Sequence, residues 1–354
     1  MAYPTVVMDS AVKRKVRTID ASWSTPQLLD ALSLSLKGEG PALSTEPIPT
    51  DEVDSRVSLI ITTSGSTGAP KSVLLTTQAL LASTRATHKY LSATSGQRWS
   101  LLLPTNHIAG LNVLVRSIEL GTNPVGVEST ADYTAIVPTQ LHRALNGDEV
   151  LFTHLKKCTA VLVGGGPLDA QLHRQAIAAG INVIATYGMT ETCGGLIYNG
   201  TPLDGVQVEI RNQHIALRAP QLALGYLDAP LPNEDGWFIT NDLGVIEDDK
   251  VIVLGRADDQ IISGGEKISL SAVETFLQNE FQSPEIVAFA KPDKEWGQQL
   301  CIATTLELEL LNIQSKLKEK FGAHTSPKQL VKVAAIPYLG IGKPDRKKLA
   351  NDHA

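Results

Sequence analysis

Residues 62–71, T-T-S-G-S-T-G-A-P-K, combine five hydroxyl side chains, two glycines and one lysine. Backbone N–H groups, hydroxyl donors and a cation together can surround a polyphosphate. The segment is not a Walker A loop, because Pro70 replaces the glycine before the lysine and has no N–H to donate. The residues predicted to bind phosphate are Thr63, Ser64, Gly65, Ser66, Thr67, Gly68 and Lys71.

The flanks of this loop predict a strand–loop–strand arrangement. Residues 57–61 and 73–76 are apolar and rich in β-branched side chains, so both read as strands. A helix is expected over residues 78–90. A short buried strand is expected at Leu101–Leu103, ending at Pro104.

Residues 159–187 predict a β-α-β unit. The expected parts are a strand at 159–163, a GGGP turn at 164–167, a helix at 168–179 and a strand at 181–186. Ligands of open α/β sheets bind at the carboxyl ends of parallel strands. Gly164–Gly166 and Tyr187 are therefore expected to line one crevice.

The composition changes after Arg256, and the remaining chain reads as a small α+β unit. A helix opening at Ser271, with Glu274 completing a capping box, is expected first. The other expected elements are strands at 286–290 and 300–305 and a helix at 313–321. We predict two domains, 1–256 and 257–354.

Composition limits the classes of function. The net charge of −6 offers no basic surplus for nucleic acid, and no apolar run reaches the roughly 18 residues of a membrane span. The N-terminus lacks the pattern of a secretory signal. Three well-separated cysteines fit neither a disulfide framework nor a zinc site. A cytoplasmic protein without structural metal is expected.

Four further motifs follow the loop in order: Y-G-M-T-E at 187–191, G-W-F-I-T-N-D at 236–242, the segment 255–268, and G-K-P-D-R at 342–346. Together they resemble the adenylate-forming superfamily of acyl-CoA synthetases, adenylation domains and luciferases. The resemblance implies an α/β fold with a large N-terminal domain of layered sheets and a small mobile C-terminal domain. It also implies a shortened N-terminal region, because the loop begins near residue 62.

The resemblance implies two half-reactions. A carboxylate attacks the α-phosphate of ATP, and a thiol, usually coenzyme A, then displaces AMP. Lys343 is the implied catalytic cation, although a surface lysine in a basic tail is the alternative. Glu191 is the implied Mg²⁺ ligand and is also expected to be a catalytic residue.

The remaining motif residues are implied to bind nucleotide and thiol. Those for adenine and ribose are Gly164, Gly165, Gly166, Tyr187, Gly188, Thr190, Asp242 and Arg256. A structural salt bridge is the alternative for Arg256. Asp258 is the implied hinge, and Gly264 and Gly265 are implied to admit the pantetheine arm, with a simple tight turn as their alternative.

Residues 103–117 resemble the corresponding segment of the o-succinylbenzoate–CoA ligases of menaquinone biosynthesis. A helix is expected at 108–116. Arg116 lies in an apolar run of this helix, so its charge must either pair with an anion or lie at the protein surface. Because that substrate carries a second carboxylate, Arg116 is its expected counter-ion, with a structural arginine as the alternative. His107 and Gly188 are expected beside the acid, with a role at the helix N-terminus as the alternative for His107.

Other functions stay open. The chain could be a ligase for another aryl or medium-chain acid, a stand-alone adenylation domain serving a carrier protein, or an inactive relative that only binds nucleotide. A homodimer is compatible with the sequence.

Overall fold

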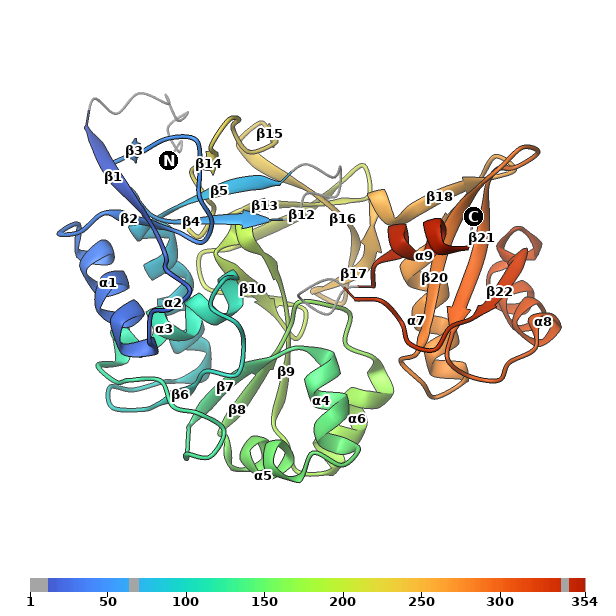
Figure 1. The fold of residues 1–354 in the computed structure, drawn as a ribbon, viewed down its shortest axis with the longest axis horizontal. Helices are drawn as coiled ribbons and strands as arrows, with labels where there is room; N and C mark the ends of the chain where they lie inside the picture. The colour runs from blue at the N-terminus through green and yellow to red at the C-terminus, as the bar shows by residue number, and fades with distance from the viewer. Residues whose placement is uncertain (1–11, 64–69, 339–343, 354) are drawn as a thin grey trace. The chain divides into compact units, whose positions relative to one another are not determined.

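The computed structural model describes residues 12–63, 70–338 and 344–353. The chain separates into two compact units (Figure 1). The first unit comprises Met1–Arg211, Ala216–Thr240 and Ile246–Val251, and the second comprises Asn212–Ile215, Asn241–Val245 and Ile252–Ala354.

The first sheet of the first unit carries the predicted hairpin. Its strand order is β14-β5-β4-β2-β1-β3. The strands are β1 Lys13–Thr18, β2 Ala42–Ser44, β3 Glu52–Asp54, β4 Val57–Thr63, β5 Lys71–Thr76 and β14 Gly225–Tyr226. β4 and β5 pair antiparallel, with Thr63 opposite Lys71. The strand–loop–strand prediction is confirmed.

The second sheet has the order β11-β10-β9-β8-β7-β6. Its strands are β6 Trp99–Ser100, β7 Tyr133–Ile136, β8 Ala160–Val163, β9 Val183–Met189, β10 Gly194–Tyr198 and β11 Thr201–Pro202. Strands β6 to β9 are parallel, and β8 and β9 enclose helix α6, Ala170–Ala178, which confirms the β-α-β prediction. The strand predicted at Leu101–Leu103 is wrong. The ladder ends at Ser100, and the three leucines are irregular and only half-buried.

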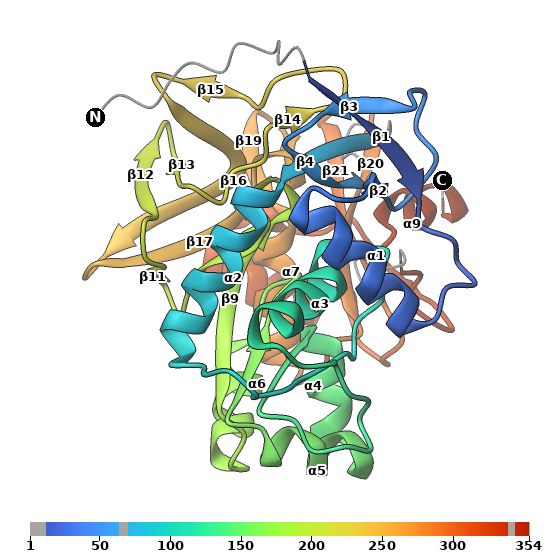
Figure 2. The same ribbon diagram turned by 90° about the vertical axis from the view of Figure 1, so that its left-hand side faces the viewer.

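Helices cover both faces of the second sheet. Helices α2, Thr77–Leu91, and α3, Ile108–Leu120, lie between the two sheets (Figure 2). They pack on the first sheet together with α1, Thr25–Lys37, and on the second sheet through the cluster around Trp99. Helices α4 Pro138–Leu145, α5 Glu149–Lys157 and α6 cover the opposite face of the second sheet. The helix predicted at 78–90 is confirmed by α2.

The third sheet has the order β12-β13-β16-β15, and β17 pairs with β16. Its strands are β12 Gln207–Arg211, β13 His214–Arg218, β15 Asn233–Glu234, β16 Trp237–Glu247 and β17 Lys250–Arg256. Strands β13, β16 and β17 contribute residues to both units.

The second unit contains a mixed sheet of order β19-β18-β21-β20, in which β22 pairs with β21. Its elements are β18 Gln260–Ser263, β19 Glu266–Ser269, α7 Leu270–Glu280, β20 Ile286–Asp293, β21 Gly297–Thr304, α8 Leu310–Phe321, β22 Gln329–Lys332 and α9 Arg346–Asp352. Helices α7 and α8 pack on one face through the cluster around Leu277, and α9 packs through Leu349 on the other. The predicted strands and helix of this region are confirmed.

The capping box predicted at Ser271 and Glu274 is wrong. Helix α7 begins two residues earlier than that box requires, because Ser269 is the N-cap and its hydroxyl accepts from the Ala272 N–H. Glu274 is therefore free to pair with Arg346, at 2.9 Å from its Nη2.

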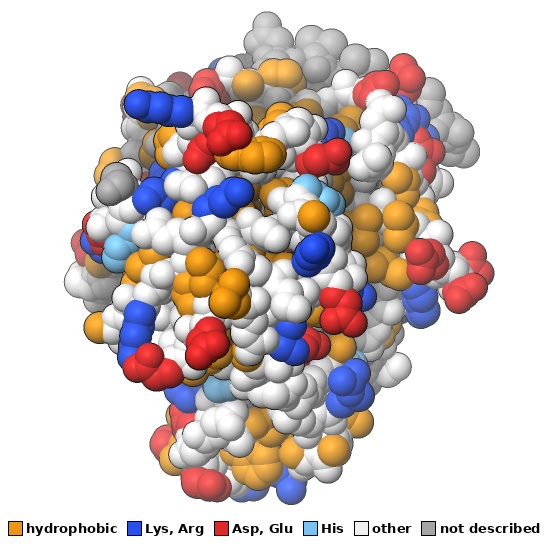
Figure 3. Space-filling model, turned by 90° about the vertical axis from the view of Figure 1, so that its right-hand side faces the viewer, with side chains coloured by type: hydrophobic (Ala, Val, Ile, Leu, Met, Phe, Trp, Pro, Cys, Tyr) orange, Lys and Arg blue, Asp and Glu red, His pale blue; other side chains and the backbone are white. Residues whose placement is uncertain are grey.

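The described surface shows charges of both signs. Figure 3 shows Lys and Arg side chains interspersed with Asp and Glu over the face it draws. Among the described helices, none has both the length and the apolar content needed to cross a membrane.

Candidate active site

Two parts of the predicted site lie outside the described residues. These are Ser64, Gly65, Ser66, Thr67 and Gly68 of the phosphate loop, and the lysine at position 343. The ends of the phosphate loop are described. Thr63 closes β4 and donates its hydroxyl to the Lys71 carbonyl at 3.3 Å, and the Lys71 side chain is exposed.

The described residues on either side of 339–343 contact one another. Tyr338 and Pro344 form a β-bridge, and the Asp345 N–H donates to the Pro337 carbonyl at 2.8 Å. Arg346 then bonds the Ala288 carbonyl and pairs with Glu274 and Asp259. The spacing between Arg346 and Lys343 therefore places the lysine three residues from a fixed point of the second unit.

Glu191 lies in a short 3₁₀ turn, η1 Thr190–Thr192, which joins β9 to β10. The Thr192 hydroxyl accepts from the Met189 N–H at 2.9 Å and donates to the Gly194 carbonyl at 2.7 Å, so the turn is closed on itself. The Ala223 N–H donates to the Glu191 carbonyl at 2.8 Å. The carboxylate is half-buried, and its Oε1 accepts from the Tyr226 hydroxyl at 2.9 Å.

Cys193 fixes the other side of this turn. It has a left-handed backbone (φ +50°), and its carbonyl accepts from Ser83 on α2 at 2.8 Å and from Asn112 on α3 at 2.9 Å. Burial raises the pKa of the Cys193 thiol, so this cysteine is structural. The three cysteines are free and buried, as expected.

The donors around Glu191 fit magnesium. No group of three or more Asp, Glu, His or Cys side chains in the described part of the chain could hold a metal by itself. Magnesium in nucleotide sites needs only one or two carboxylates, with phosphate oxygens and water completing its shell. One Glu191 oxygen accepts from Tyr226, and the second is available to such an ion.

The glycines beside β8 and β9 are required by close packing. A Cβ at Gly164 would lie 2.4 Å from Thr186 Oγ1, and one at Gly188 would lie 2.0 Å from the Gly194 carbonyl oxygen. Gly164 directly follows β8 and packs against Thr186, the residue before Tyr187 on the neighbouring parallel strand β9. Tyr187 lies within β9 and not after it, because β9 continues to Met189 by pairing antiparallel with β10.

Asp242, Arg256 and Asp258 form one ion-pair network. Arg256 binds Asp258 through two hydrogen bonds of 2.7 and 2.9 Å, and its Nη1 lies 3.6 Å from Asp242 Oδ1. The hydrogen bonds that Arg256 donates to Asp258 are the main cause of a raised pKa at Arg256. The salt bridge considered as the alternative for Arg256 is therefore present. Asp242 is 8% exposed and lies within β16.

Gly264 and Gly265 form the two-residue turn between β18 and β19. Both have positive φ angles, +60° and +88°, and a Cβ at Gly264 would lie 2.4 Å from the Trp296 ring. The tight turn accounts for both glycines, as the alternative reading expected. Apart from its chain neighbours, no described residue has an atom within 4 Å of the ideal Cβ position of Gly265.

Arg116 is buried on α3 without a carboxylate partner in the described part of the chain. It is 4% exposed, its guanidinium lies 4.8 Å from the Trp99 ring centroid, and its Nη2 is 3.5 Å from Thr87 Oγ1. Its Nε has no hydrogen-bond partner. Burial lowers the pKa of Arg116. The charge is thus desolvated and only weakly compensated.

Other buried polar atoms near α2 and α3 also lack partners. They are Thr84 Oγ1, His88 Nε2, Trp99 Nε1, Asn112 Oδ1 and Ser117 Oγ. Burial, with a smaller contribution from Arg116, lowers the pKa of His88 to about 4, so this histidine is neutral at pH 7. His107 precedes α3 as its N-cap and makes no side-chain cap bond, and burial lowers its pKa.

Sequence reasoning missed two aromatic residues. Tyr226 contacts Glu191 and Lys71, and Trp99 underlies Arg116. Both lie in two-residue strands, which carry no periodic signal. The G-Y dipeptide at 225–226 was the available cue for Tyr226.

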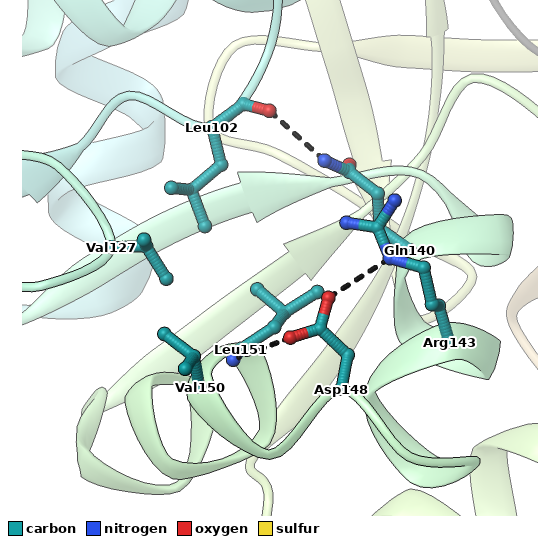
Figure 4. A pocket seen from close by; sticks show the side chains of 7 residues that line it. All are labelled: Leu102, Val127, Gln140, Arg143, Asp148, Val150 and Leu151. Atoms are coloured by element: carbon teal, nitrogen blue, oxygen red, sulfur yellow. Dashed lines mark hydrogen bonds and ion pairs between the residues drawn. The ribbon is translucent and has the colours of Figure 1, made fainter.

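A shallow pocket beside α4 and α5 is separate from these residues (Figure 4). It is lined by Leu102, Val127, Gln140, Arg143, Asp148, Val150 and Leu151. Its polar groups already bind one another: Gln140 donates to the Leu102 carbonyl, and Arg143 pairs with Asp148 at 3.0 Å. The pocket therefore offers few free groups to a ligand.

Comparison with known proteins identifies the relatives of this chain. A probable 2-succinylbenzoate–CoA ligase of Mycobacterium tuberculosis is 36% identical over 95% of this chain and 97% of its own length. The 2-succinylbenzoate–CoA ligase of Enterococcus faecalis is 30% identical over 81% of this chain and 68% of its own length.

Solved structures show the same fold. A variant of Escherichia coli MenE with bound OSB-AMS has a TM-score of 0.74 at 25% identity, covering 95% of this chain and 81% of that one. The o-succinylbenzoate CoA synthetase of Bacillus subtilis in complex with OSB-AMP has a TM-score of 0.73 at 23% identity, covering 94% and 82%. The AMP-binding enzyme family itself matches over residues 5–227, more than half of the sequence. The chain therefore belongs to the family of AMP-binding enzymes.

Proposed function

We propose that the protein is an AMP-forming acid–thiol ligase. It activates 2-succinylbenzoate (o-succinylbenzoate) with ATP and transfers the acyl group to coenzyme A in menaquinone biosynthesis. The observation that carries the choice of acid is Arg116, a buried cation with no carboxylate partner among the described residues. The names of the relatives support the same assignment.

The first half-reaction brings two anions together. A carboxylate oxygen of the acid attacks the α-phosphorus, and the bond from that phosphorus to pyrophosphate breaks. Lys343 and the phosphate loop, with Lys71, Thr63, Ser64, Gly65, Ser66, Thr67 and Gly68, would hold the phosphates and neutralise their charge. Magnesium bound at Glu191 would supply further positive charge to the phosphate oxygens.

Separate groups of residues are proposed to bind the adenine and the ribose. Tyr187 offers a ring face to adenine beside Gly164, Gly165 and Gly166, with Gly188 and Thr190 following on the same strand and turn. Asp242 would accept hydrogen bonds from the ribose hydroxyls. Arg256 would reach the ribose only by sharing its guanidinium with Asp258, to which it is already bonded.

The acid would place its second carboxylate at Arg116. A carboxylate there would supply the acceptor that Arg116 Nε lacks and would balance a desolvated charge. A ligase for a monocarboxylic acid would have no use for this cation. His107, half-buried at the start of α3, and Gly188 would lie beside the acid.

The second half-reaction replaces AMP with a thiolate sulfur. We propose that residues 257–354 act as a lid over residues 1–256, with Asp258 as the hinge, and that the pantetheine arm passes Gly264 and Gly265. The open space around the Gly265 Cβ position is compatible with that approach. Homodimerisation and a cytoplasmic location remain predictions.

Isotope exchange between pyrophosphate and ATP tests the first half-reaction and the acid together. We expect rapid exchange with 2-succinylbenzoate and much slower exchange with 4-oxo-4-phenylbutanoate, which lacks only the aromatic carboxylate. Equal exchange with both acids, or faster exchange with a medium-chain acid, would support the alternative of a different acid ligase. No exchange with any acid would support an inactive nucleotide-binding relative.

A further inference from the structure

Tyr226 lies between two residues with separate roles in the proposed site. Its hydroxyl donates to Glu191 Oε1 at 2.9 Å, and the Lys71 ammonium lies 5.2 Å from the centroid of its ring. The tyrosine is 9% exposed, whereas Lys71 is exposed and Glu191 is half-buried. One buried side chain therefore contacts both the magnesium carboxylate and the phosphate-loop lysine.

The backbone around Tyr226 is fixed on both sides. Strand β14 pairs antiparallel with β5, which places Tyr226 opposite Val73, and the Leu227 N–H donates to the Ser72 carbonyl at 2.8 Å. Three residues before Tyr226, Ala223 donates to the carbonyl of Glu191 itself. The ring is thus tied both to the strand that begins at Lys71 and to the turn that carries Glu191.

The chemistry of the two contacts is complementary. A carboxylate has two oxygens, so a phenol that donates to Oε1 fixes the rotation of the carboxylate and leaves Oε2 for a metal ion. Hydrogen bonds to metal-binding carboxylates often change metal affinity by about 10- to 100-fold when they are removed. The ring face attracts the Lys71 ammonium and holds it near the phosphate site before a nucleotide binds.

We propose that Tyr226 is a positioning residue that couples magnesium binding at Glu191 to phosphate binding at Lys71. This inference rests on the proposed function, in which Glu191 holds the metal and Lys71 holds the phosphates. In this role Tyr226 acts through Glu191 and Lys71 and not on the substrate itself. It acts by fixing one carboxylate and one ammonium group relative to each other.

Calorimetric titration of ATP into the full-length protein, with Mg²⁺ and with EDTA, tests the proposal. The ratio of the two ATP affinities measures how much the metal contributes. Tyr226→Phe removes the hydroxyl and keeps the ring, so we expect this ratio to fall about tenfold while metal-free affinity stays within about twofold. Tyr226→Leu also removes the ring, and metal-free affinity should fall by about a further threefold.

Two control variants separate the inference from the proposed function. Tyr133→Phe removes another phenol hydroxyl of the first unit, bonded to Gln97 at 2.9 Å, and should leave the ratio unchanged. Glu191→Gln should lower the ratio, and Tyr226→Phe should add nothing in that background because the carboxylate it positions is gone. Circular dichroism checks that each variant is folded.

The outcomes are distinct. A lowered ratio in Glu191→Gln with a normal ratio in Tyr226→Phe overturns the inference and leaves the proposed function standing. A normal ratio in Glu191→Gln overturns the inference together with the metal role proposed for Glu191, because the metal then binds elsewhere, and pyrophosphate–ATP exchange still tests the ligase activity separately. If Tyr226→Phe does not fold, Glu191→Asp provides a second test, because the shorter side chain moves the carboxylate away from the Tyr226 hydroxyl. A ratio of ATP affinities equal to that of the unmodified protein would then overturn the inference.

Discussion

Replacing Arg116 by methionine should separate a ligand-binding arginine from a structural one. Arg116 is 4% exposed, its guanidinium makes one long hydrogen bond of 3.5 Å, and its Nε has no partner among the described residues. An arginine that served the fold would normally have its donors paired. Methionine keeps much of the volume and removes the charge.

The expected change in stability is small. Leaving a buried donor unpaired costs about 1–3 kcal/mol, and stacking of the cation on Trp99 returns about 1–2 kcal/mol. These terms nearly cancel, so Arg116→Met should change the free energy of unfolding by about 1 kcal/mol or less. The binding term is larger, because a carboxylate about 4 Å from the cation gains about 4 kcal/mol at an effective dielectric constant of 20.

Two measurements check this prediction. Urea unfolding gives the stability change, and steady-state kinetics give KM for 2-succinylbenzoate and for 4-oxo-4-phenylbutanoate. A loss of about 2–4 kcal/mol corresponds to a KM for 2-succinylbenzoate raised about 30- to 1000-fold. The KM for the monocarboxylate should change by less than about threefold, because no ion pair is lost.

Arg218→Met is the matched control. Arg218 also stacks on a tryptophan, 4.6 Å from the Trp237 centroid, but it lies on β13 and bonds backbone carbonyls. Its replacement should not distinguish the two acids. The reasoning is refuted if Arg116→Met lowers stability by several kcal/mol and raises KM equally for both acids, since Arg116 would then be structural.

Three other predictions concern Lys343, Arg346 and His88. Lys343→Ala should abolish pyrophosphate–ATP exchange and leave thioester formation from supplied acyl-adenylate largely intact; equal loss of both steps contradicts its role. Arg346→Met should lower the stability of the second unit by about 2–3 kcal/mol in urea unfolding, because the partly buried Glu274 loses its ion-pair partner and keeps only the Ala288 N–H. Adding Glu274→Gln should restore much of this loss, and no recovery contradicts the pairing. The pKa of His88, about 4 in the folded chain, lies below its usual 6.5. The buried, neutral form of His88 therefore makes its full contribution to the free energy of unfolding above pH 6.5, and this contribution is lost as the pH falls towards 4. After allowance for partial exposure, we expect this loss to be about 2 kcal/mol. The His88→Gln variant should therefore show a free energy of unfolding that changes less between pH 6.5 and pH 4. An unchanged pH profile contradicts this assignment.

The elements that carry strong local patterns were predictable from sequence. The strands around the phosphate loop, the β-α-β unit at 159–187 and the strands and helix of the second unit all follow from apolar periodicity and turn residues. The error at Leu101–Leu103 arose because a short apolar run does not show where a parallel ladder ends. Val125 pairs with Ser100 and Trp99, and no local signal predicted that partner.

The side chains that position the site were less predictable, because their partners are distant in sequence. Glu274 fits a capping box locally, yet it pairs with Arg346, 72 residues away. Tyr226 reaches Glu191 across 35 residues through a two-residue strand. The motifs therefore located the candidate chemistry, while the structure was needed to find what holds it in place.

Mass spectrometry of a complete reaction tests the central proposal most directly. The full-length protein is incubated with ATP, Mg²⁺, coenzyme A and a panel of acids that includes 2-succinylbenzoate and 4-oxo-4-phenylbutanoate. The account predicts AMP and the coenzyme A thioester of 2-succinylbenzoate in equal amounts, with little product from the monocarboxylate. Thioesters of other acids alone, or no AMP with any acid, would contradict it.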